Sequence, residues 1–123
     1  MNMKKGNVVV HKVNENVDLT VRKIEDSKVI CLHFNKNTLK QEVYSIEELQ
    51  LSEYQEDDCK IKIDGEVKLK SGGPLMKVIK VNSNEVVCVW KDGKTNSRET
   101  FYDFELTEYK SIYDGLSDTQ NMC

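Results

Sequence analysis

Two glycines and the only proline of the chain, Gly72, Gly73 and Pro74, follow Ser71 directly, and a cluster of this kind can bind phosphate. Phosphate-binding loops use glycines so that backbone N–H groups close on the oxygens at the start of a helix. Here the residues that follow, 75–79, alternate like a strand, and no Gly-Lys-Ser/Thr ending is present. We therefore expect a structural turn, in which glycine supplies a positive φ and proline fixes the next residue.

Cys31 and His33 form a Cys-x-His pair, and alternate positions of a strand point to the same face. Both residue types bind zinc, but a zinc site needs about four ligands. The remaining candidates outside the C-terminal tail are His11, Cys59 and Cys88. Because no CxxC pair occurs and Cys31 and Cys88 lie in apolar runs, we expect free, buried thiols, no metal site and no cofactor.

Catalytic side chains are scarce. The chain has two histidines and no Gly-x-Ser-x-Gly motif, so nucleophilic catalysis has no visible machinery. Glu48 and Glu105 recur at equivalent positions, but we expect them on the exposed side of a helical turn, as solvated charges or caps. The sequence thus predicts no catalytic residue and a protein that is not an enzyme, with a small metal-dependent enzyme as the least favoured alternative.

The elements that would position these residues occur twice. Residues 19–49 align with residues 76–106 at a spacing of 57 without a gap. The matched pairs include Val21/Val78, Cys31/Cys88, Thr38/Thr95, Glu48/Glu105 and Leu49/Leu106. Upstream, Gly6 to Val10 match Gly65 to Leu69 at a spacing of 59, which gives the first copy two extra residues in its first turn.

Each copy is predicted to be a series of short strands. Alternating or β-branched runs cover 8–10, 19–21, 29–34 and 40–45, and their counterparts in the second copy. Asp92-Gly93 is a hairpin signal between the third and fourth strands of the second copy, and a helical turn is expected before a last short strand. Five strands with one such turn predict an all-β chain of two tandem five-stranded SH3-like (KOW/Tudor-like) barrels, packed on each other.

The expected domain organisation follows from these copies. Residues 1–51 form the first barrel, 52–63 an acidic linker that is solvated, 64–109 the second barrel, and 110–123 a flexible tail. Apolar residues make up 38% of the chain, and no apolar run reaches the roughly 20 residues of a membrane span. The start of the chain lacks the apolar segment of a signal peptide, so we expect a cytoplasmic protein without membrane contact.

The second copy has a Gly-acid-Val start, a Ser-Gly-Gly-Pro-x-Met turn, a Cys-x-Trp strand and a Phe…Leu close. The residues of this pattern are Gly65, Val67, Leu69, Ser71, Gly72, Gly73, Pro74, Met76, Val78, Cys88, Trp90, Asp92, Gly93, Phe101 and Leu106. In this pattern the second copy resembles the YodC-like small bacterial proteins of unknown function. The first copy carries His33 where Trp90 stands and looks like a diverged relative. The resemblance implies a compact β fold and brings no activity.

Binding surfaces are the remaining source of function. The aromatic residues Trp90, Phe101, Tyr102, Phe104 and Tyr109 lie in the second copy, where Trp90 and Phe101 also suit a small core. The candidate binding residues are Trp90, Tyr102, Phe104, Tyr109, Lys91 and Lys94. SH3-like barrels commonly bind peptides or nucleic acid through such aromatics, so we expect a protein or peptide partner.

A nucleic-acid partner is the alternative prediction. It would use the basic residues of the second copy, which are Lys68, Lys70, Lys77, Lys80, Lys91, Lys94 and Arg98. The first four of these residues are predicted to form a basic stripe. The formal net charge of the chain is −3, which argues against strong non-specific binding to phosphates. The sequence does not indicate the oligomeric state.

Overall fold

The computed structural model describes residues 3–58 and 60–109, which form two five-stranded antiparallel sheets. The first comprises β1 (Val8–His11), β2 (Asp18–Glu25), β3 (Lys28–Asn35), β4 (Thr38–Ser45), the 3-10 helix η1 (Ile46–Glu48) and β5 (Leu49–Leu51). The second comprises β6 (Glu66–Leu69), β7 (Met76–Asn82), β8 (Glu85–Asp92), β9 (Thr95–Tyr102), the 3-10 helix η2 (Asp103–Glu105) and β10 (Leu106–Glu108). No α-helix occurs in this part of the chain, which confirms the all-β prediction.

The two sheets have the same strand order. The first runs β4-β3-β2-β1-β5 and the second, in the equivalent direction, β9-β8-β7-β6-β10. β3 and β8, β4 and β9, and the two 3-10 helices all begin 57 residues apart. The irregularity in β2 between Val21 and Lys23 recurs in β7 between Val78 and Lys80. The repeat spacing read from the sequence therefore matches the arrangement of the last four strands of each sheet.

The first strand departs from the predicted alignment. Val9 pairs with Leu51 in the first sheet, and Val67 pairs with Glu108 in the second, so these strands correspond at a spacing of 58. The spacing of 59, which aligned Val8 with Val67, is wrong by one residue. A slip of one residue moves every side chain to the opposite face, and three consecutive valines give the sequence no means of fixing that register.

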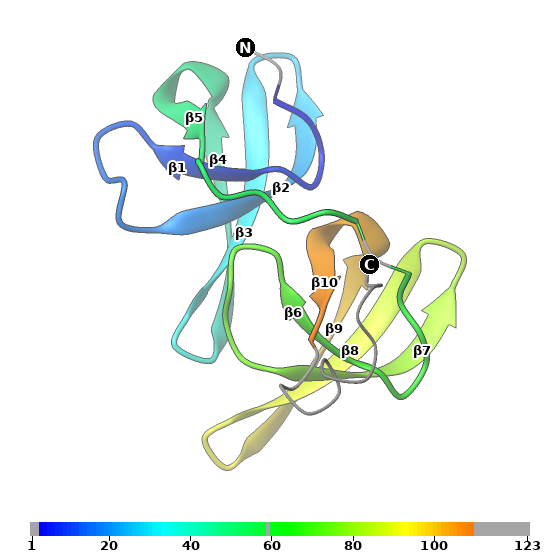
Figure 1. Cartoon of the computed structure of the whole chain (residues 1–123). Coiled ribbons are helices and arrows are strands. Elements are labelled where there is room, and N and C mark those ends of the chain that lie inside the picture. The colour runs from blue at the N-terminus through cyan, green and yellow to red at the C-terminus, as the bar shows by residue number, and fades with distance from the viewer. Residues whose placement is uncertain (1–2, 59, 110–123) are drawn as a thin grey trace.

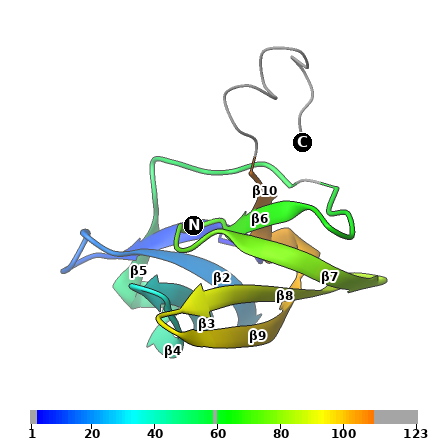
Figure 2. The same ribbon diagram turned by 90° about the horizontal axis from the view of Figure 1, so that it is seen from below.

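Each sheet encloses an apolar core, but the two cores differ in size. The first contains Val9, Leu19, Val21, Val29, Cys31 and Leu49. The second contains Val67, Leu69, Met76, Val78, Val86, Cys88, Trp90, Phe101 and Leu106, and also Leu32 from the first sheet. Phe34 and Leu39 of the first sheet pack against the same cluster. Side chains of β3 and β4 thus complete the second core. Figures 1 and 2 show the β3–β4 hairpin lying beside the second sheet.

The first sheet is buried on both faces where the second sheet covers it. Val8, Thr20 and Leu32 are neighbours across β1, β2 and β3, and all three are buried. The equivalent row of the second sheet is Glu66, Lys77 and Val89. Glu66 and Lys77 are exposed. The outer face of the first sheet therefore packs on the second sheet, whereas the corresponding face of the second sheet faces solvent.

The connection between the sheets lies against both of them. The side-chain amide of Gln55 donates to the carbonyl of Val8 at 2.6 Å and accepts from its N–H at 2.8 Å, as a neighbouring strand would. Asp58 forms an ion pair with Lys70, and Ile61 packs against the core of the second sheet. The acidic connection, expected to be solvated, is mostly exposed and is anchored at these points.

Candidate binding groove between the two sheets

The turn between β6 and β7 receives an aromatic side chain of the first sheet. Gly72 and Gly73 have φ values of +105° and +128°, and the Gly72 N–H donates to the Leu69 carbonyl at 2.8 Å. A Cβ on Gly73 would lie 2.4 Å from Cδ2 of Phe34. The glycine pair thus reverses the chain, as predicted, and Gly73 also leaves the space that Phe34 fills.

The tip of the β3–β4 hairpin reaches the second sheet beside this turn (Figure 1). The Phe34 ring meets the Trp90 ring edge-on, with centroids 5.3 Å apart and an interplanar angle of 88°. The indole N–H of Trp90 donates to the Asn37 carbonyl at 2.8 Å. Thr20 accepts a hydrogen bond from the Ser71 N–H at 2.9 Å. Apolar packing and hydrogen bonds together fix the orientation of the two sheets.

An ion pair with a buried carboxylate joins the sheets two residues further along β2 from Thr20. Arg22 donates from Nε to Oε2 of Glu105 at 2.6 Å and from Nη2 to Oε1 at 3.0 Å. The Glu105 side chain is fully buried, and its Oε1 also accepts the Tyr102 N–H at 2.9 Å. The expectation that Glu105 caps the helical turn is correct, but the expectation that it is exposed is wrong. The second sheet packs on β2 at this point, and Arg22 supplies the compensating charge.

The first-sheet counterpart of this carboxylate keeps the capping role without the buried pair. Glu48 accepts the Ser45 N–H at 2.8 Å, and its side chain is half exposed, with His11 3.7 Å away. Arg22 is specific to the junction, since the equivalent residue of the second copy is Ile79. Burial lowers the pKa of Arg22, but the hydrogen bond and charge of Glu105 outweigh this, so the pKa lies above its ordinary value.

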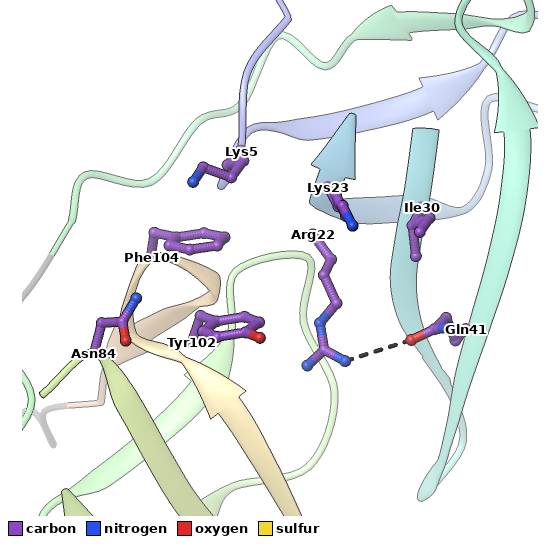
Figure 3. Close-up of a pocket in the computed structure, with 8 residues that line it drawn as sticks. All are labelled: Lys5, Arg22, Lys23, Ile30, Gln41, Asn84, Tyr102 and Phe104. Atoms are coloured by element: carbon purple, nitrogen blue, oxygen red, sulfur yellow. Dashed lines mark hydrogen bonds between the residues drawn. The ribbon is translucent and has the colours of Figure 1, made fainter. Parts of the chain in front are cut away.

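A groove of about 370 Å³ opens beside this ion pair, where β2, β3 and β4 face η2 (Figure 3). Its lining consists of Lys5, Arg22, Lys23, Ile30, Gln41, Asn84, Tyr102 and Phe104. The rings of Tyr102 and Phe104 are parallel within 5°, with centroids 5.5 Å apart. Neither sheet alone supplies these walls, because the aromatic pair belongs to the second sheet and most of the other lining residues belong to the first.

Positive groups lie close to both rings. Lys5 Nζ is 5.2 Å from the centroid of Phe104, and the guanidinium of Arg22 is 5.4 Å from that of Tyr102. Figure 3 shows Lys5 over Phe104, with Arg22 extending between Tyr102 and Gln41, to which it donates a hydrogen bond of 3.4 Å. The groove therefore offers flat apolar surface flanked by cations, a combination that attracts aromatic and anionic groups.

The structure separates the residues that the sequence grouped as one surface. Tyr102 and Phe104 meet in the groove, as just described. Trp90 is only 7% exposed and belongs to the core and the junction, so it offers no free ring to a partner. Lys91 and Lys94 lie at the β8–β9 hairpin, at the opposite end of β9 from Tyr102. Tyr109 is exposed with Lys68 over its ring, outside the groove.

The proposed basic stripe is broken by the fold. Lys70 is buried and forms an ion pair with Asp58, where the connecting segment passes the end of β6. Lys77 and Lys80 are exposed on β7, on either side of the irregularity that shifts its alternation. The expectation that Lys70 contributes to a basic surface is therefore wrong, because the position after β6 is enclosed by the junction.

The three cationic residues of the groove, Lys5, Arg22 and Lys23, were not predicted as binding residues. The available signal was the contrast between equivalent positions of the two sheets rather than their similarity, because Arg22 aligns with Ile79. Phe34, which aligns with Lys91, marked the junction in the same way. A residue whose type changes between copies on an otherwise matched strand reports what each face contacts.

Cys31 and Cys88 are buried free thiols at equivalent positions of the two cores, as predicted. Burial is the main cause that raises the pKa of each to about 12. Within residues 3–58 and 60–109, no group of three or more metal-binding side chains comes together. The prediction for Cys59 and the tail 110–123 lies outside the described residues.

Comparison with known proteins gives one family match. Residues 64–106 match a family described as uncharacterised small proteins (DUF2158). The matched segment covers β6 to the first residue of β10, so it coincides with the second sheet and with the residues on which the YodC-like resemblance rests. No curated protein matches the chain. Among the described residues, no helix has the length and apolar character needed to cross a membrane.

Proposed function

We propose that this protein is a non-enzymatic binding module that holds a segment of a partner protein in the groove between its two sheets. The observation that carries the proposal is the stacked Tyr102–Phe104 pair flanked by Lys5, Arg22 and Lys23. These groups bind and orient a ligand, and none of them forms a nucleophile–base pair. The cytoplasm is the proposed compartment.

The proposed architecture is a pair of SH3-like barrels that arose by duplication, the first being a diverged copy of the second. The strand order within each sheet and the 3-10 helix before the last strand support it. SH3-like barrels bind extended peptides through aromatics near that helix, and Tyr102 and Phe104 flank the start of η2 here. The fold analogy thus points to the same groove as the geometry.

The chemistry of the walls selects the ligand class. Lys5 and Lys23 favour carboxylates, and the parallel rings favour an aromatic or apolar side chain. Arg22 is already paired with Glu105, so it contributes a planar surface more than a free charge. We infer a peptide in which an aromatic or apolar residue lies next to Asp or Glu.

Selection from a random peptide display library tests this proposal. The full chain should enrich acidic sequences with an apolar or aromatic anchor, and Tyr102→Ala/Phe104→Ala should lose them at least tenfold. Tyr109→Ala is the matched control, because Tyr109 is an exposed aromatic outside the groove. Circular dichroism confirms that each variant is folded. Enriched peptides that bind the double variant as well as the wild type would reject the groove.

Binding of single-stranded nucleic acid is the second candidate, since stacked aromatics beside cations also hold unpaired bases. The scattered basic residues of β6–β9 and the net charge of −3 support it less. A fluorescent oligothymidine discriminates the two. Phosphate contacts predict affinity that collapses between about 50 and 200 mM salt, whereas binding of the peptide, which combines the two rings with two lysines, should weaken much less.

A further inference from the structure

The first sheet contains a cavity at the place where the second sheet holds Phe34. In the second sheet, Phe34 lies between the β6–β7 turn and Trp90. The corresponding space in the first sheet lies between the β1–β2 turn and His33, which aligns with Trp90. That space is a cavity of about 330 Å³, lined by residues that include Val13, Val17, Leu19, His33, Glu42 and Tyr44. We call it the first-sheet socket.

The positions that line the two sockets correspond closely. Leu19 aligns with Met76, His33 with Trp90, and Tyr44 with Phe101, all at the spacing of 57. Leu19 and Met76 are both core residues that follow the first turn of their sheets. The first-sheet socket is thus built from the same framework as a site that, in this molecule, accepts an aromatic ring.

The lining of the first-sheet socket is apolar at its rim and acidic on one wall. Val13 is 88% exposed and Val17 39%. Glu42 holds its carboxylate between His33 Nε2, at 2.7 Å, and the hydroxyl of Tyr44, which donates at 2.9 Å. Glu42 is the only acidic residue that lines the socket, and no lysine or arginine lines it. Lys40 lies opposite His33 in the register of β3 and β4. The wall complements a cation next to the inserted ring.

We propose that the first-sheet socket binds a basic segment of a separate protein, which inserts an aromatic side chain between the β1–β2 turn and His33 and places a Lys or Arg beside Glu42. A second copy of this chain is a poorer occupant, because its β8–β9 hairpin presents Lys91 where the β3–β4 hairpin presents Phe34. The sheet face next to that hairpin would also have to pack on the first sheet of the other copy, and this face carries the charged row that includes Glu66 and Lys77.

The chain supplies its own probe. Residues 32–41, LHFNKNTLKQ, are the hairpin that fills the second-sheet site, and they contain one phenylalanine, two lysines and no acidic residue. A cyclised peptide of this sequence, titrated into isotopically labelled full-length protein, should shift the amide signals of Val17, Leu19 and His33. The same peptide with alanine in place of its phenylalanine should bind at least tenfold more weakly.

Two protein variants make the test specific. Glu42→Gln keeps groups that can bond His33 and Tyr44 but removes the charge, so the affinity should fall three- to tenfold at low salt. Tyr102→Ala/Phe104→Ala should leave the affinity unchanged, since these rings belong to the other site. The inference is overturned by shifts confined to Gly73 and Trp90, by equal binding of the alanine peptide, or by concentration-dependent self-association through Lys91.

Discussion

Arg22 and Glu105 illustrate how one residue pair decides the arrangement of two sheets. The carboxylate of Glu105 has no exposure, so its burial is tolerated only because Arg22 and the Tyr102 N–H hold it. The equivalent Glu48 needs no such partner, because no second sheet covers it. Arg22 on β2 therefore marks the outer face of the first sheet, which packs on the second sheet, and the equivalent position of the second sheet carries Ile79 instead.

Removal of Arg22 should be strongly destabilising. Arg22→Met leaves a buried carboxylate without its cation, which lowers the free energy of unfolding by about 3–5 kcal/mol in comparable sites. Urea unfolding followed by circular dichroism measures the change. Lys23→Met is the control, because the Lys23–Glu25 pair is exposed and is expected to contribute less than about 1 kcal/mol.

The single variant Glu105→Met and the double variant Arg22→Met/Glu105→Met complete a double-mutant cycle. With both charges removed, the loss should be smaller than for Arg22→Met alone, giving a coupling energy above about 1 kcal/mol. Equal losses for Arg22→Met and Lys23→Met would contradict the description of this pair as the polar centre of the junction.

The two buried thiols predict a specific dependence on pH. Cys31 and Cys88 keep their protons up to a pKa of about 12 in the folded state, whereas unfolding returns them to an ordinary thiol pKa of 9.0. The folded state therefore binds more protons between pH 9 and 12, and the free energy of unfolding must fall as the pH rises through that range. Below pH 9 the thiols have no such effect.

Unfolding by urea at pH 8 and pH 10 measures this slope. The variant Cys31→Val/Cys88→Val should show a smaller decrease than the wild type, because lysine and tyrosine contributions cancel in the comparison. In the native protein at pH 8, both thiols should react with a thiol reagent far more slowly than in urea. Identical slopes for the two proteins would show that the thiols are not buried as described.

At the scale of elements, the β6–β7 turn requires glycine for two separate reasons, a positive φ at both positions and space for Phe34 at Gly73. Gly72 and Gly73 both have positive φ, but a Cβ on Gly72 meets nothing within 4 Å, while one on Gly73 collides with Phe34. Gly72→Ala should show backbone strain alone, and Gly73→Ala should be less stable than Gly72→Ala by a further 1–3 kcal/mol or so.

The comparison includes its own rescue. Phe34→Ala removes Cγ and Cδ2, the two atoms that the new methyl group would strike, so it should be less harmful in the Gly73→Ala background than in the wild type. Thermal unfolding of the four proteins measures this non-additivity. Equal stability of Gly72→Ala and Gly73→Ala would contradict the insertion of Phe34 at this turn.

The sequence predicted the elements well because the strands of each sheet follow local sequence rules. Asp92-Gly93 signalled the β8–β9 hairpin, and the alternation around Cys31 and Cys88 identified the core-facing side of β3 and β8. The register of β1 was not predictable, since Val8, Val9 and Val10 fit either face. That apolar run did carry a signal, because a strand with both faces buried has no polar alternation.

The candidate site was predictable only in part. Tyr102 and Phe104 were found from their aromatic character and position after β9. Trp90, predicted both as a core residue and as a binding residue, lies in the core. Lys70 was misplaced as a surface residue, and Lys5 and Arg22 were missed, because their environment is set by the other sheet. Local pattern describes a residue's own strand, whereas the junction depends on which faces of two similar sheets meet.

At the scale of the whole molecule, the two sheets pack together asymmetrically, because only the first sheet uses its outer face in the junction. The outer face of the first sheet packs on the second, but the equivalent face of the second remains charged and exposed. Leu32 lies within the second core, so neither sheet retains its packing without the other. The groove exists as a consequence of this arrangement, since its walls come from both sheets.

Equilibrium unfolding in urea tests this arrangement most directly when the same samples are monitored by both Trp90 fluorescence and far-ultraviolet circular dichroism. Trp90 is the only tryptophan and reports the junction and second core, while circular dichroism reports both sheets. We predict one shared transition, and Phe34→Ala should move both curves to lower urea together. Two separate transitions, or a Phe34→Ala variant whose Trp90 curve is unchanged, would contradict it.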